Sequence, residues 1–378
     1  MTQTPASPTP DPGALQAIGW PMGEAGDGPA AWRDALAAHP GARPVRVVEQ
    51  HRTGYVVADA PGDGFNVESL GDWLRPAGYR DGRTDPTDRP GVGDWLLIEG
   101  DRRQAKAVAL LPRWSAIKRG AAGEHYRQQL IAANIDVAFV VCGLDGDFNP
   151  RRIERYLLLV QGGGVEPVVV LTKIDLADAD AAAAILRAAV GESLAVVAVN
   201  SKDAASVAQL DPWLGAGRTA VLVGSSGAGK STLTNTLLGI EKMKTGEVRG
   251  NDSRGRHTTT HRALIPLPQG GCLIDTPGMR ELKPTGEEDV TDTFADVEAL
   301  AAECRFRDCK HEKEPGCAVR AAVQAKTLDP LRLANFMKLS GEVAGAATRL
   351  ATRRQQKAES KPGSKPGGRR PDDKYGKR

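Results

Sequence analysis

A glycine-rich segment in the middle of the chain has the residue types and spacing of a phosphate-binding loop. The apolar run 219–223 leads into GSSGAGKST at residues 224–232. In a strand followed by G-x-x-x-x-G-K-[ST], backbone amides and the lysine surround nucleotide phosphates, and the final hydroxyl binds Mg²⁺. A chance glycine-rich turn is the alternative, but the strand, loop and helix-forming residues arrive in the required order. The expected nucleotide contacts are Gly224, Ser225, Ser226, Gly227, Ala228, Gly229, Lys230, Ser231 and Thr232.

A second metal contact is expected where residues 271–274 run into Asp275, Thr276, Pro277 and Gly278. A carboxylate at the end of a strand can hold Mg²⁺ through water, and the Gly278 amide can meet a γ-phosphate. We therefore assign catalytic roles to Lys230 and Asp275.

The polar stretch RGRHTTTH at residues 254–261 lies between the P-loop and Asp275 and has no core periodicity. One threonine hydroxyl here is expected to complete Mg²⁺ coordination, which would make the stretch a nucleotide-dependent switch. The alternative is a solvated polar loop. The candidate switch residues are Thr258, Thr259 and Thr260.

Two short segments at strand ends could select guanine. Asp175, in Thr172-Lys173-Ile174-Asp175, can accept hydrogen bonds from guanine N1 and its exocyclic amine, a donor pair that adenine lacks. Ser201, in Asn200-Ser201-Lys202, would offer its backbone amide to the guanine carbonyl oxygen. The order is unusual, because the Asp175 motif lies about fifty residues upstream of the P-loop, whereas ordinary GTPases carry it downstream. We infer a circularly permuted GTPase domain.

A cysteine cluster near the C-terminus has the ligands of a structural zinc site. Three thiols and one imidazole lie within fourteen residues, at Cys304, Cys309, His311 and Cys317. Four such ligands satisfy a tetrahedral Zn²⁺ and leave no open position for catalysis. Free cysteines with a surface histidine, or a redox pair, are the alternatives.

Bulk composition limits the classes that this chain can belong to. Its 378 residues suggest two or three domains. The formal net charge is +3, but residues 349–378 hold eleven lysines and arginines against three acidic residues. No apolar run reaches the roughly eighteen residues of a membrane helix, and no signal peptide is recognisable. We expect a cytoplasmic, monomeric protein that has no contact with membranes.

The pattern along the chain predicts five parts. Residues 1–42 are rich in Pro, Gly and Ala and are expected to form a flexible extension, and residues 43–116 contain short strands that fit a small β-barrel, with an OB-fold as the leading candidate. Alternating buried strands and helices predict an α/β GTPase domain over 117–291. A mainly helical zinc-binding domain should follow over 292–352. Residues 353–378 should form a disordered basic tail that binds an acidic partner.

The motif order, the RGRHTTT segment and the cysteine signature CRFRDCKHEKEPGC together resemble the ribosome small subunit-dependent GTPase A family, also called the YjeQ/YloQ class. The resemblance covers residues 43–345. It implies an N-terminal OB-fold, a permuted GTPase domain and a zinc-binding domain. It also implies rRNA binding and GTP hydrolysis stimulated by the small ribosomal subunit, late in assembly of that subunit.

Two positions depart from the usual pattern. Thr172 stands where the usual guanine motif has Asn; its hydroxyl can donate to guanine N7 but cannot replace both contacts of an amide. Met279 stands where many GTPases have the glutamine that orients the attacking water. His257 is the nearest candidate substitute, and a histidine without a catalytic role is an equally good interpretation.

The predicted function is therefore hydrolysis of GTP to GDP and phosphate, with Mg²⁺ and one Zn²⁺ as cofactors and with the small ribosomal subunit and its rRNA as partners. A P-loop ATPase or small-molecule kinase is one rival, which Asp175 and Ser201 argue against. An RNA-binding scaffold with a vestigial nucleotide site is the other, which Lys230, Ser231 and Asp275 argue against.

Overall fold

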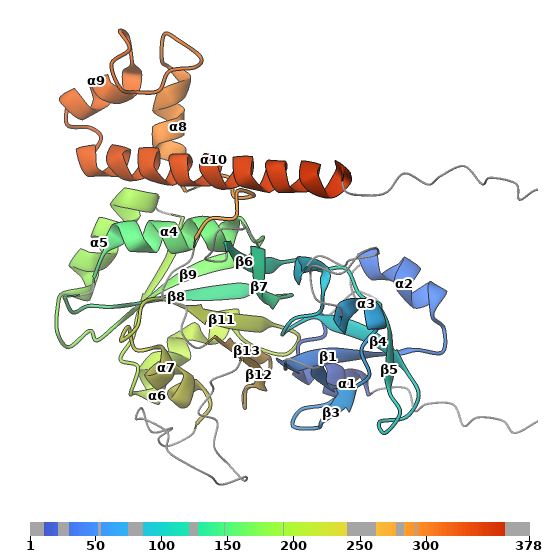
Figure 1. Cartoon of the computed structure of the whole chain (residues 1–378). Helices are drawn as coiled ribbons and strands as arrows, with labels where there is room; N and C mark the ends of the chain where they lie inside the picture. The colour runs from blue at the N-terminus through green and yellow to red at the C-terminus, as the bar shows by residue number, and fades with distance from the viewer. Residues whose placement is uncertain are drawn as a thin grey trace, which may run out of the picture.

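The computed structural model describes residues 11–21, 30–51, 54–74, 86–120, 128–146, 148–191, 193–239, 262–276, 283–291 and 293–359. At its centre is a mostly parallel sheet in the order β10-β9-β8-β11-β13-β12, with only β12 antiparallel to its neighbour β13 (Figure 1). The strands are β8 (Val137–Gly143), β9 (Glu166–Thr172), β10 (Ala195–Ala198), β11 (Thr219–Val223), β12 (Ala263–Pro266) and β13 (Cys272–Asp275). β11 thus lies between β8 and β13 in the sheet. β8 comes well before β11 in the sequence, and β13 comes after it.

Helices cover both faces of this sheet, as the alternation of apolar residues requires. Phe139 of β8 packs in one core with Leu233 of the helix that follows the P-loop, whereas Val140 packs in the other core with Ile153. One face carries α6 (Ala204–Val207), η3 (Ala208–Trp213) and α7 (Lys230–Leu237), and the other carries α4 (Pro150–Gln161) and α5 (Ala179–Val190). The predicted α/β organisation of this part of the chain is confirmed.

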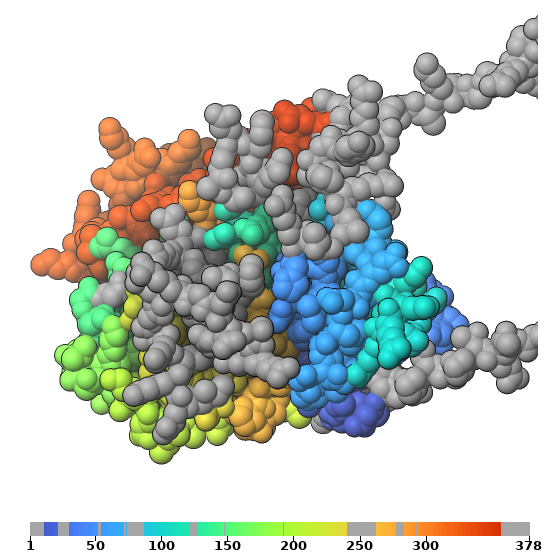
Figure 2. All heavy atoms as spheres, turned by 60° about the horizontal axis from the view of Figure 1, so that its bottom comes forward, coloured from blue at the N-terminus to red at the C-terminus, as the bar shows by residue number. Residues whose placement is uncertain are grey.

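The N-terminal strands form a small barrel beside the sheet. Antiparallel pairs join β3 to β2, β2 to β1, β1 to β4 and β4 to β5, and a parallel bridge between Glu68 and Lys106 joins β5 back to the end of β3. β1 also pairs with β12 at Glu49 and Ala263, so the barrel continues the edge of the central sheet (Figure 1). In the space-filling view the blue N-terminal residues lie against the yellow and orange part of the chain (Figure 2). The elements are β1 (Arg43–Gln50), β2 (Tyr55–Ala58), β3 (Gly64–Val67), α3 (Gly71–Leu74), η2 (Pro86–Asp88), β4 (Trp95–Glu99) and β5 (Lys106–Leu110).

The segment before the barrel differs from our expectation of a flexible extension. Its described parts contain α1 (Pro12–Ala17), η1 (Ala30–Trp32) and α2 (Arg33–Ala38). Trp32 is fully buried and donates through Nε1 to the carbonyl of Pro112 at 2.7 Å. Trp20 lies edge-on to Trp95 with ring centroids 4.7 Å apart. Composition suggested disorder, but aromatic side chains that pack on the barrel hold residues 11–20 and 30–42 in place.

A buried arginine joins the barrel to the central sheet. Arg46 of β1 is fully buried, and its Nη1 donates to the Ile18 carbonyl at 2.6 Å and to Thr219 Oγ1 at 2.8 Å. Its Nη2 donates to the Asn134 carbonyl at 2.9 Å. Burial lowers the pKa of Arg46. Since Thr219 begins β11, one side chain connects the N-terminal segment, the barrel and the strand that leads to the P-loop.

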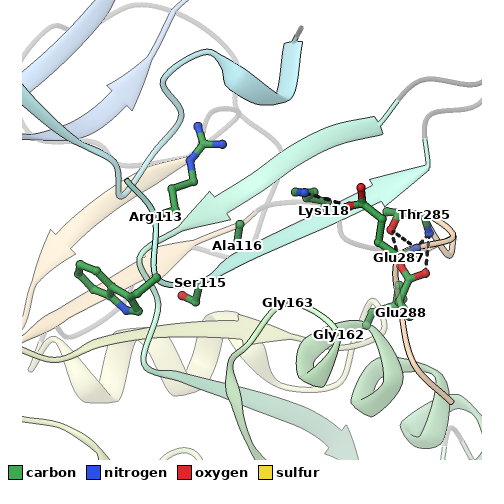
Figure 3. Close-up of a pocket in the computed structure, with 11 residues that line it drawn as sticks. Arg113, Ser115, Ala116, Lys118, Gly162, Gly163, Thr285, Glu287 and Glu288 are labelled. Atoms are coloured by element: carbon green, nitrogen blue, oxygen red, sulfur yellow. Dashed lines mark hydrogen bonds and ion pairs between the residues drawn. The ribbon is translucent and has the colours of Figure 1, made fainter. Parts of the chain in front are cut away.

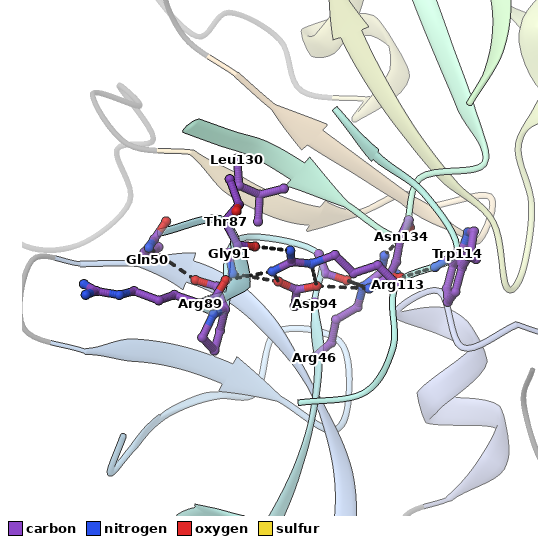
Figure 4. A network of polar contacts seen from close by, with 12 residues as sticks. Arg46, Gln50, Thr87, Arg89, Gly91, Asp94, Arg113, Trp114, Leu130 and Asn134 are labelled. Atoms are coloured by element: carbon purple, nitrogen blue, oxygen red, sulfur yellow. Dashed lines mark hydrogen bonds and ion pairs between the residues drawn. The ribbon is translucent and has the colours of Figure 1, made fainter. Parts of the chain in front are cut away.

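A second arginine extends this network, which Figure 4 shows. Arg113 makes a two-point contact with the buried carboxylate of Asp94, with Nε to Oδ1 and Nη2 to Oδ2 both at 2.7 Å. Burial raises the pKa of Asp94, although the hydrogen bond from Arg113 opposes that shift. Asn134, with a left-handed φ of 53°, donates from its side chain to the Gly93 carbonyl at 3.1 Å. The turn before β4 is therefore fixed by polar contacts from residues distant in sequence.

A hairpin and a helical domain complete the fold. The hairpin, β6 (Ala116–Gly120) and β7 (Gln128–Ala133), forms a separate two-stranded sheet that we did not predict. The helical domain contains α8 (Ala295–Ala302), α9 (Ala318–Gln324) and α10 (Pro330–Glu359). α10 lies across α4, on the sheet face opposite α7 (Figure 1). It also continues through residues 353–359, where we expected the disordered tail to begin; residues 360–378 lie outside the described ranges.

Ion pairs connect the helical domain to α4. Arg332 of α10 pairs with the buried Glu154 of α4 at 2.9 Å and with Asp296 at 2.7 Å. Arg155 contacts both carboxylate oxygens of Glu342, at 2.5 and 2.9 Å. Burial raises the pKa of Glu154. The interface is thus polar as well as apolar, and it holds the helical domain against the helix-covered face of the central sheet.

Candidate nucleotide-binding site

The P-loop lies between β11 and α7, and two of its glycines are required by the backbone. Gly224 has a φ of 146°, and a Cβ there would lie 2.2 Å from the Val141 carbonyl oxygen. Gly229 has a φ of 97° and precedes the first residue of α7. The Lys230 ammonium donates to the Gly224 carbonyl at 2.8 Å and to the Ser225 carbonyl. Lys230 therefore lies over the loop whose amides are expected to bind phosphate.

The two predicted base-reading segments meet the P-loop at one pocket. This pocket has a volume of about 420 Å³ and lies at the carboxyl ends of β9 and β10, where open α/β sheets bind ligands. Asp175 is exposed at its rim, and Lys173 forms an ion pair with Asp145 of the loop after β8. The residues that line it are Lys173, Asp175, Leu176, Asn200, Ser201, Lys202, Gly229 and Thr232. Segments 172–175, 200–202 and 224–232 are therefore brought together. Ile174 is half-buried and packs against the core between β8 and α4.

The structure places Thr172 away from the pocket. Its side chain is fully buried, and Oγ1 donates to the Ala228 carbonyl of the P-loop at 2.6 Å. A hydroxyl group carries one hydrogen, so it cannot also donate to guanine N7. While this hydrogen bond is kept, the Thr172 hydroxyl is not available to guanine N7, so the direct Thr172–N7 contact that we expected stays a prediction.

The turn that contains Ser201 is held by its neighbours. The Asn200 amide donates to Ser206 Oγ at 2.9 Å, and the Lys202 amide donates to Asn200 Oδ1 at 3.1 Å. Thr236 of α7 donates to the Ser201 carbonyl at 2.6 Å. The turn is thereby fixed against the helix that follows the P-loop.

The predicted Mg²⁺ ligands come from the end of β13 and from the first turn of α7. β13 runs parallel to β11 with Ile274 opposite Val221, so Asp275 lies one position further towards the P-loop end of the sheet. Thr276 Oγ1 donates to the Leu222 carbonyl at 3.1 Å and ties the two ends together. Ser231 is exposed in the first turn of α7. The predicted switch residues His257, Thr258, Thr259 and Thr260 lie outside the described residues, as do Pro277, Gly278 and Met279.

The four residues of the cysteine cluster come together in the loop between α8 and α9. Their ligand atoms all lie within 4.8 Å of one another. His311 Nδ1 is 3.4 Å from Cys317 Sγ and 3.7 Å from Cys304 Sγ. Burial alone would raise the pKa of Cys304, but hydrogen bonds from the Val319 and Ala318 amides and from Cys317 and Cys309 lower it overall. Three thiols and one imidazole at this spacing could hold one zinc ion.

A second cavity, of about 290 Å³, lies where the hairpin, α4 and the segment 283–288 meet (Figure 3). Charged groups in its wall have partners within the protein: Lys118 pairs with Glu287 at 3.0 Å, and Glu288 accepts the Thr285 amide at 2.7 Å. Burial alone would raise the pKa of Glu287, but the hydrogen bond from Lys118 and the charges of Lys118 and Arg354 lower it overall. We interpret this cavity as part of the interface between the domains.

Sequence reasoning missed the residues that connect the domains. Arg46 stands within an apolar strand and Glu154 within an amphipathic helix. A charge at a position where the pattern requires an apolar residue was the available signal, because such a group needs a buried partner. The sequence did not identify those partners, which lie far away in the chain; Arg332, for example, follows Glu154 by 178 positions.

Comparison with known proteins gives consistent results. A family model described as RsgA GTPase matches residues 110–285. A small ribosomal subunit biogenesis GTPase RsgA from Xanthomonas campestris pv. campestris (strain B100) is 67% identical over 338 residues, covering 89% of this chain and 90% of that protein. The protein of the same name from Xanthomonas oryzae pv. oryzae (strain MAFF 311018) is 66% identical over 347 residues, covering 90% and 92%.

Two solved structures share the fold. The crystal structure of YjeQ from Thermotoga maritima covers 80% of this chain and 99% of its own, with a TM-score of 0.56 and 23% identity. That of YloQ, a circularly permuted GTPase, covers 80% and 95%, with a TM-score of 0.54 and 23% identity. Separately, none of the helices in the described ranges is long and apolar enough to cross a membrane.

Proposed function

Because the chain belongs to the RsgA GTPase family, we propose that it hydrolyses GTP to GDP and phosphate in response to the small ribosomal subunit, late in maturation of that subunit. The observation that carries the proposal is the meeting of three segments, 172–175, 200–202 and 224–232, at one pocket. One segment has the chemistry to hold phosphates and the other two to select guanine. Adenine lacks the pair of donors, N1–H and the adjacent exocyclic amine, that the exposed Asp175 carboxylate could accept from guanine.

The residues of the site divide the work of phosphoryl transfer. Lys230 and the P-loop amides would bind the phosphates, while the Ser231 hydroxyl and the Asp275 carboxylate would hold Mg²⁺. Mg²⁺ prefers oxygen ligands of this kind. When it is bound with GTP, it neutralises negative charge on the phosphates. Exposure of Ser231 and the position of Asp275 at the end of β13 support the assignment.

Orientation of the attacking water is assigned partly to His257 and partly to the ribosomal partner. Met279 cannot hydrogen bond to water as a glutamine would, and one of Thr258, Thr259 and Thr260 would complete the Mg²⁺ shell. His257→Ala should lower subunit-stimulated turnover, measured as phosphate release at saturating GTP. Unchanged stimulated turnover would remove His257 from the mechanism.

The remaining parts of the chain are assigned to RNA binding. Cys304, Cys309, His311 and Cys317 would hold one structural Zn²⁺ that shapes the helical domain. The ring of β1–β5 pairings supports an OB-fold, a barrel that binds nucleic acid. The tail would add contacts with phosphates that weaken with salt. We assign the protein to the cytoplasm as a monomer.

Phosphate release tests the proposal. GTP and ATP are each supplied with and without purified small ribosomal subunits, and Lys230→Ala serves as the inactive control. We expect release to rise only when GTP and the subunit are present together. Equal release from ATP, or no response to the subunit, would contradict the proposed function.

A further inference from the structure

One buried hydroxyl at the nucleotide pocket has no hydrogen-bond partner. Ser201 is 7% exposed and lines the pocket, and its Oγ is buried without a donor or acceptor contact among the described residues. Leaving a buried hydroxyl unpaired is unfavourable, because it loses its hydrogen bonds to water and gains none in the protein. Since the Ser201 carbonyl already accepts from Thr236 at 2.6 Å, the free capacity of this residue lies in its hydroxyl and its amide.

The neighbouring hydroxyl has already used its hydrogen. Thr172 Oγ1 donates to the Ala228 carbonyl at 2.6 Å, and Ala228 itself is buried. The contact keeps the P-loop against the end of β9. It leaves guanine N7 without the donor that the usual asparagine of this motif would provide.

The two hydroxyls lie close to the same residue of the pocket wall, Gly229. A Cβ placed on Gly229 would lie 3.1 Å from Thr172 Oγ1 and 3.5 Å from Ser201 Oγ. Ser201 therefore presents its hydroxyl beside the group that cannot donate, at the point where the P-loop turns into α7. Asp175 lies on a different segment of the pocket wall and would take the N1 and exocyclic amine edge of the base.

We propose that the Ser201 hydroxyl donates a hydrogen bond to the edge of guanine that carries N7 and O6, and so supplies the contact that Thr172 cannot make. This inference rests on the proposed function, because it assumes that guanine occupies the pocket. It adds a specificity-determining side chain to the backbone amide of the same residue. The asparagine of the usual motif can offer two contacts from one amide side chain. In this chain those contacts are divided between two hydroxyls: that of Thr172 binds the P-loop, and that of Ser201 binds the base.

Calorimetric binding of three ligands to the full chain tests the proposal. GDP is compared with 7-deaza-GDP, which lacks the N7 acceptor, and with 6-thio-GDP, whose sulfur is a weak acceptor. Ser201→Ala should weaken GDP binding about 3- to 10-fold. We expect Ser201 to donate to N7. The variant and the parent protein should then bind 7-deaza-GDP with equal affinity, because this analogue lacks that acceptor. Equality with 6-thio-GDP instead would support the same edge contact through O6.

Ser340→Ala is the matched control, because Ser340 Oγ is also buried without a partner but lies in α10, away from the pocket. Its GDP affinity should not change. Should Ser201→Ala fail to fold, Ser201→Cys keeps the size with a weak donor and should show the same loss. An unchanged GDP affinity in the Ser201 variant, or an equal loss for all three ligands, would overturn the inference. If the parent protein binds GDP and ADP alike, the proposed function fails instead.

Discussion

Thr172 shows how a single buried side chain can stabilise a neighbouring loop. The residue ends β9, and its hydroxyl reaches the P-loop at Ala228. Because the accepting carbonyl is buried, the contact has no water to replace it. The position of the P-loop before nucleotide binding therefore depends partly on this hydrogen bond.

Thr172→Val keeps the size and branching of the side chain and removes only the hydroxyl. We expect GDP affinity to fall about 10-fold, because the Ala228 carbonyl would be left buried without a donor. Isothermal titration calorimetry with GDP measures the change, and Thr172→Ser should bind nearly as the parent does. A Thr172→Val protein with the affinity of the parent would show that the P-loop is positioned without this bond.

At the scale of elements, α4 and α10 form the joint between the GTPase sheet and the helical domain. Glu154 of α4 is 2% exposed and Arg332 of α10 is 5% exposed, so each charge depends on the other for compensation. Asn335 also donates to Glu154. Breaking a buried pair leaves one charge without a partner, which is costly even where the intact pair contributes little.

Arg332→Met should therefore lower the free energy of unfolding by about 3 kcal/mol. Adding Glu154→Gln should recover part of that loss, since the remaining buried charge is then removed. Denaturant unfolding of the parent, both single variants and the double variant measures the coupling. Additive losses would mean that the two side chains do not act as a pair.

The same joint should respond to pH in the Arg332→Met protein. Burial raises the pKa of Glu154 above its ordinary value of 4.5, and loss of the arginine charge should raise it further. A carboxyl group with a raised folded pKa is ionised at a cost to stability, and this cost grows as pH rises from 4.5 towards the folded pKa. The variant should thus be less destabilised, relative to the parent, at pH 5 than at pH 8. An equal difference at both pH values, measured by denaturant unfolding, would contradict this assignment.

At the scale of the molecule, the permuted order changes where the chain runs after Asp275. In place of another strand of the sheet, residues 283–291 lead to α8. On the way, the Gly120 amide of β6 donates to the Lys283 carbonyl at 3.0 Å, and Glu287 pairs with Arg354 of α10 at 2.7 Å. Gly286 has a φ of 84°, and a Cβ there would lie 2.2 Å from the Ala347 amide nitrogen of α10. The segment that follows the proposed metal ligand thus lies directly against the helical domain.

We predict that the helical domain changes its orientation when GTP is replaced by GDP, since movement near Asp275 would pull on this segment. Distances between labels at exposed Ala184 of α5 and exposed Ala302 of α8 would report it. The labels should be attached by chemistry that spares cysteine, because Cys304, Cys309 and Cys317 are the proposed zinc ligands. Identical distance distributions with a GTP analogue and with GDP would refute the coupling.

The sequence by itself predicted the central α/β sheet, the permuted order, the P-loop and the spacing of the cysteine cluster. These features follow from short patterns, since a strand of alternating or buried residues and a loop of fixed glycine spacing are local properties of the chain. The tertiary structure decided the rest. It placed Trp20 and Trp32 on the barrel, where composition suggested disorder. It also committed the Thr172 hydroxyl to the P-loop, while the Ser201 hydroxyl is buried beside the pocket without a partner among the described residues. Each of these depends on contacts between residues far apart in sequence, and no local pattern specifies which partner a buried side chain will meet.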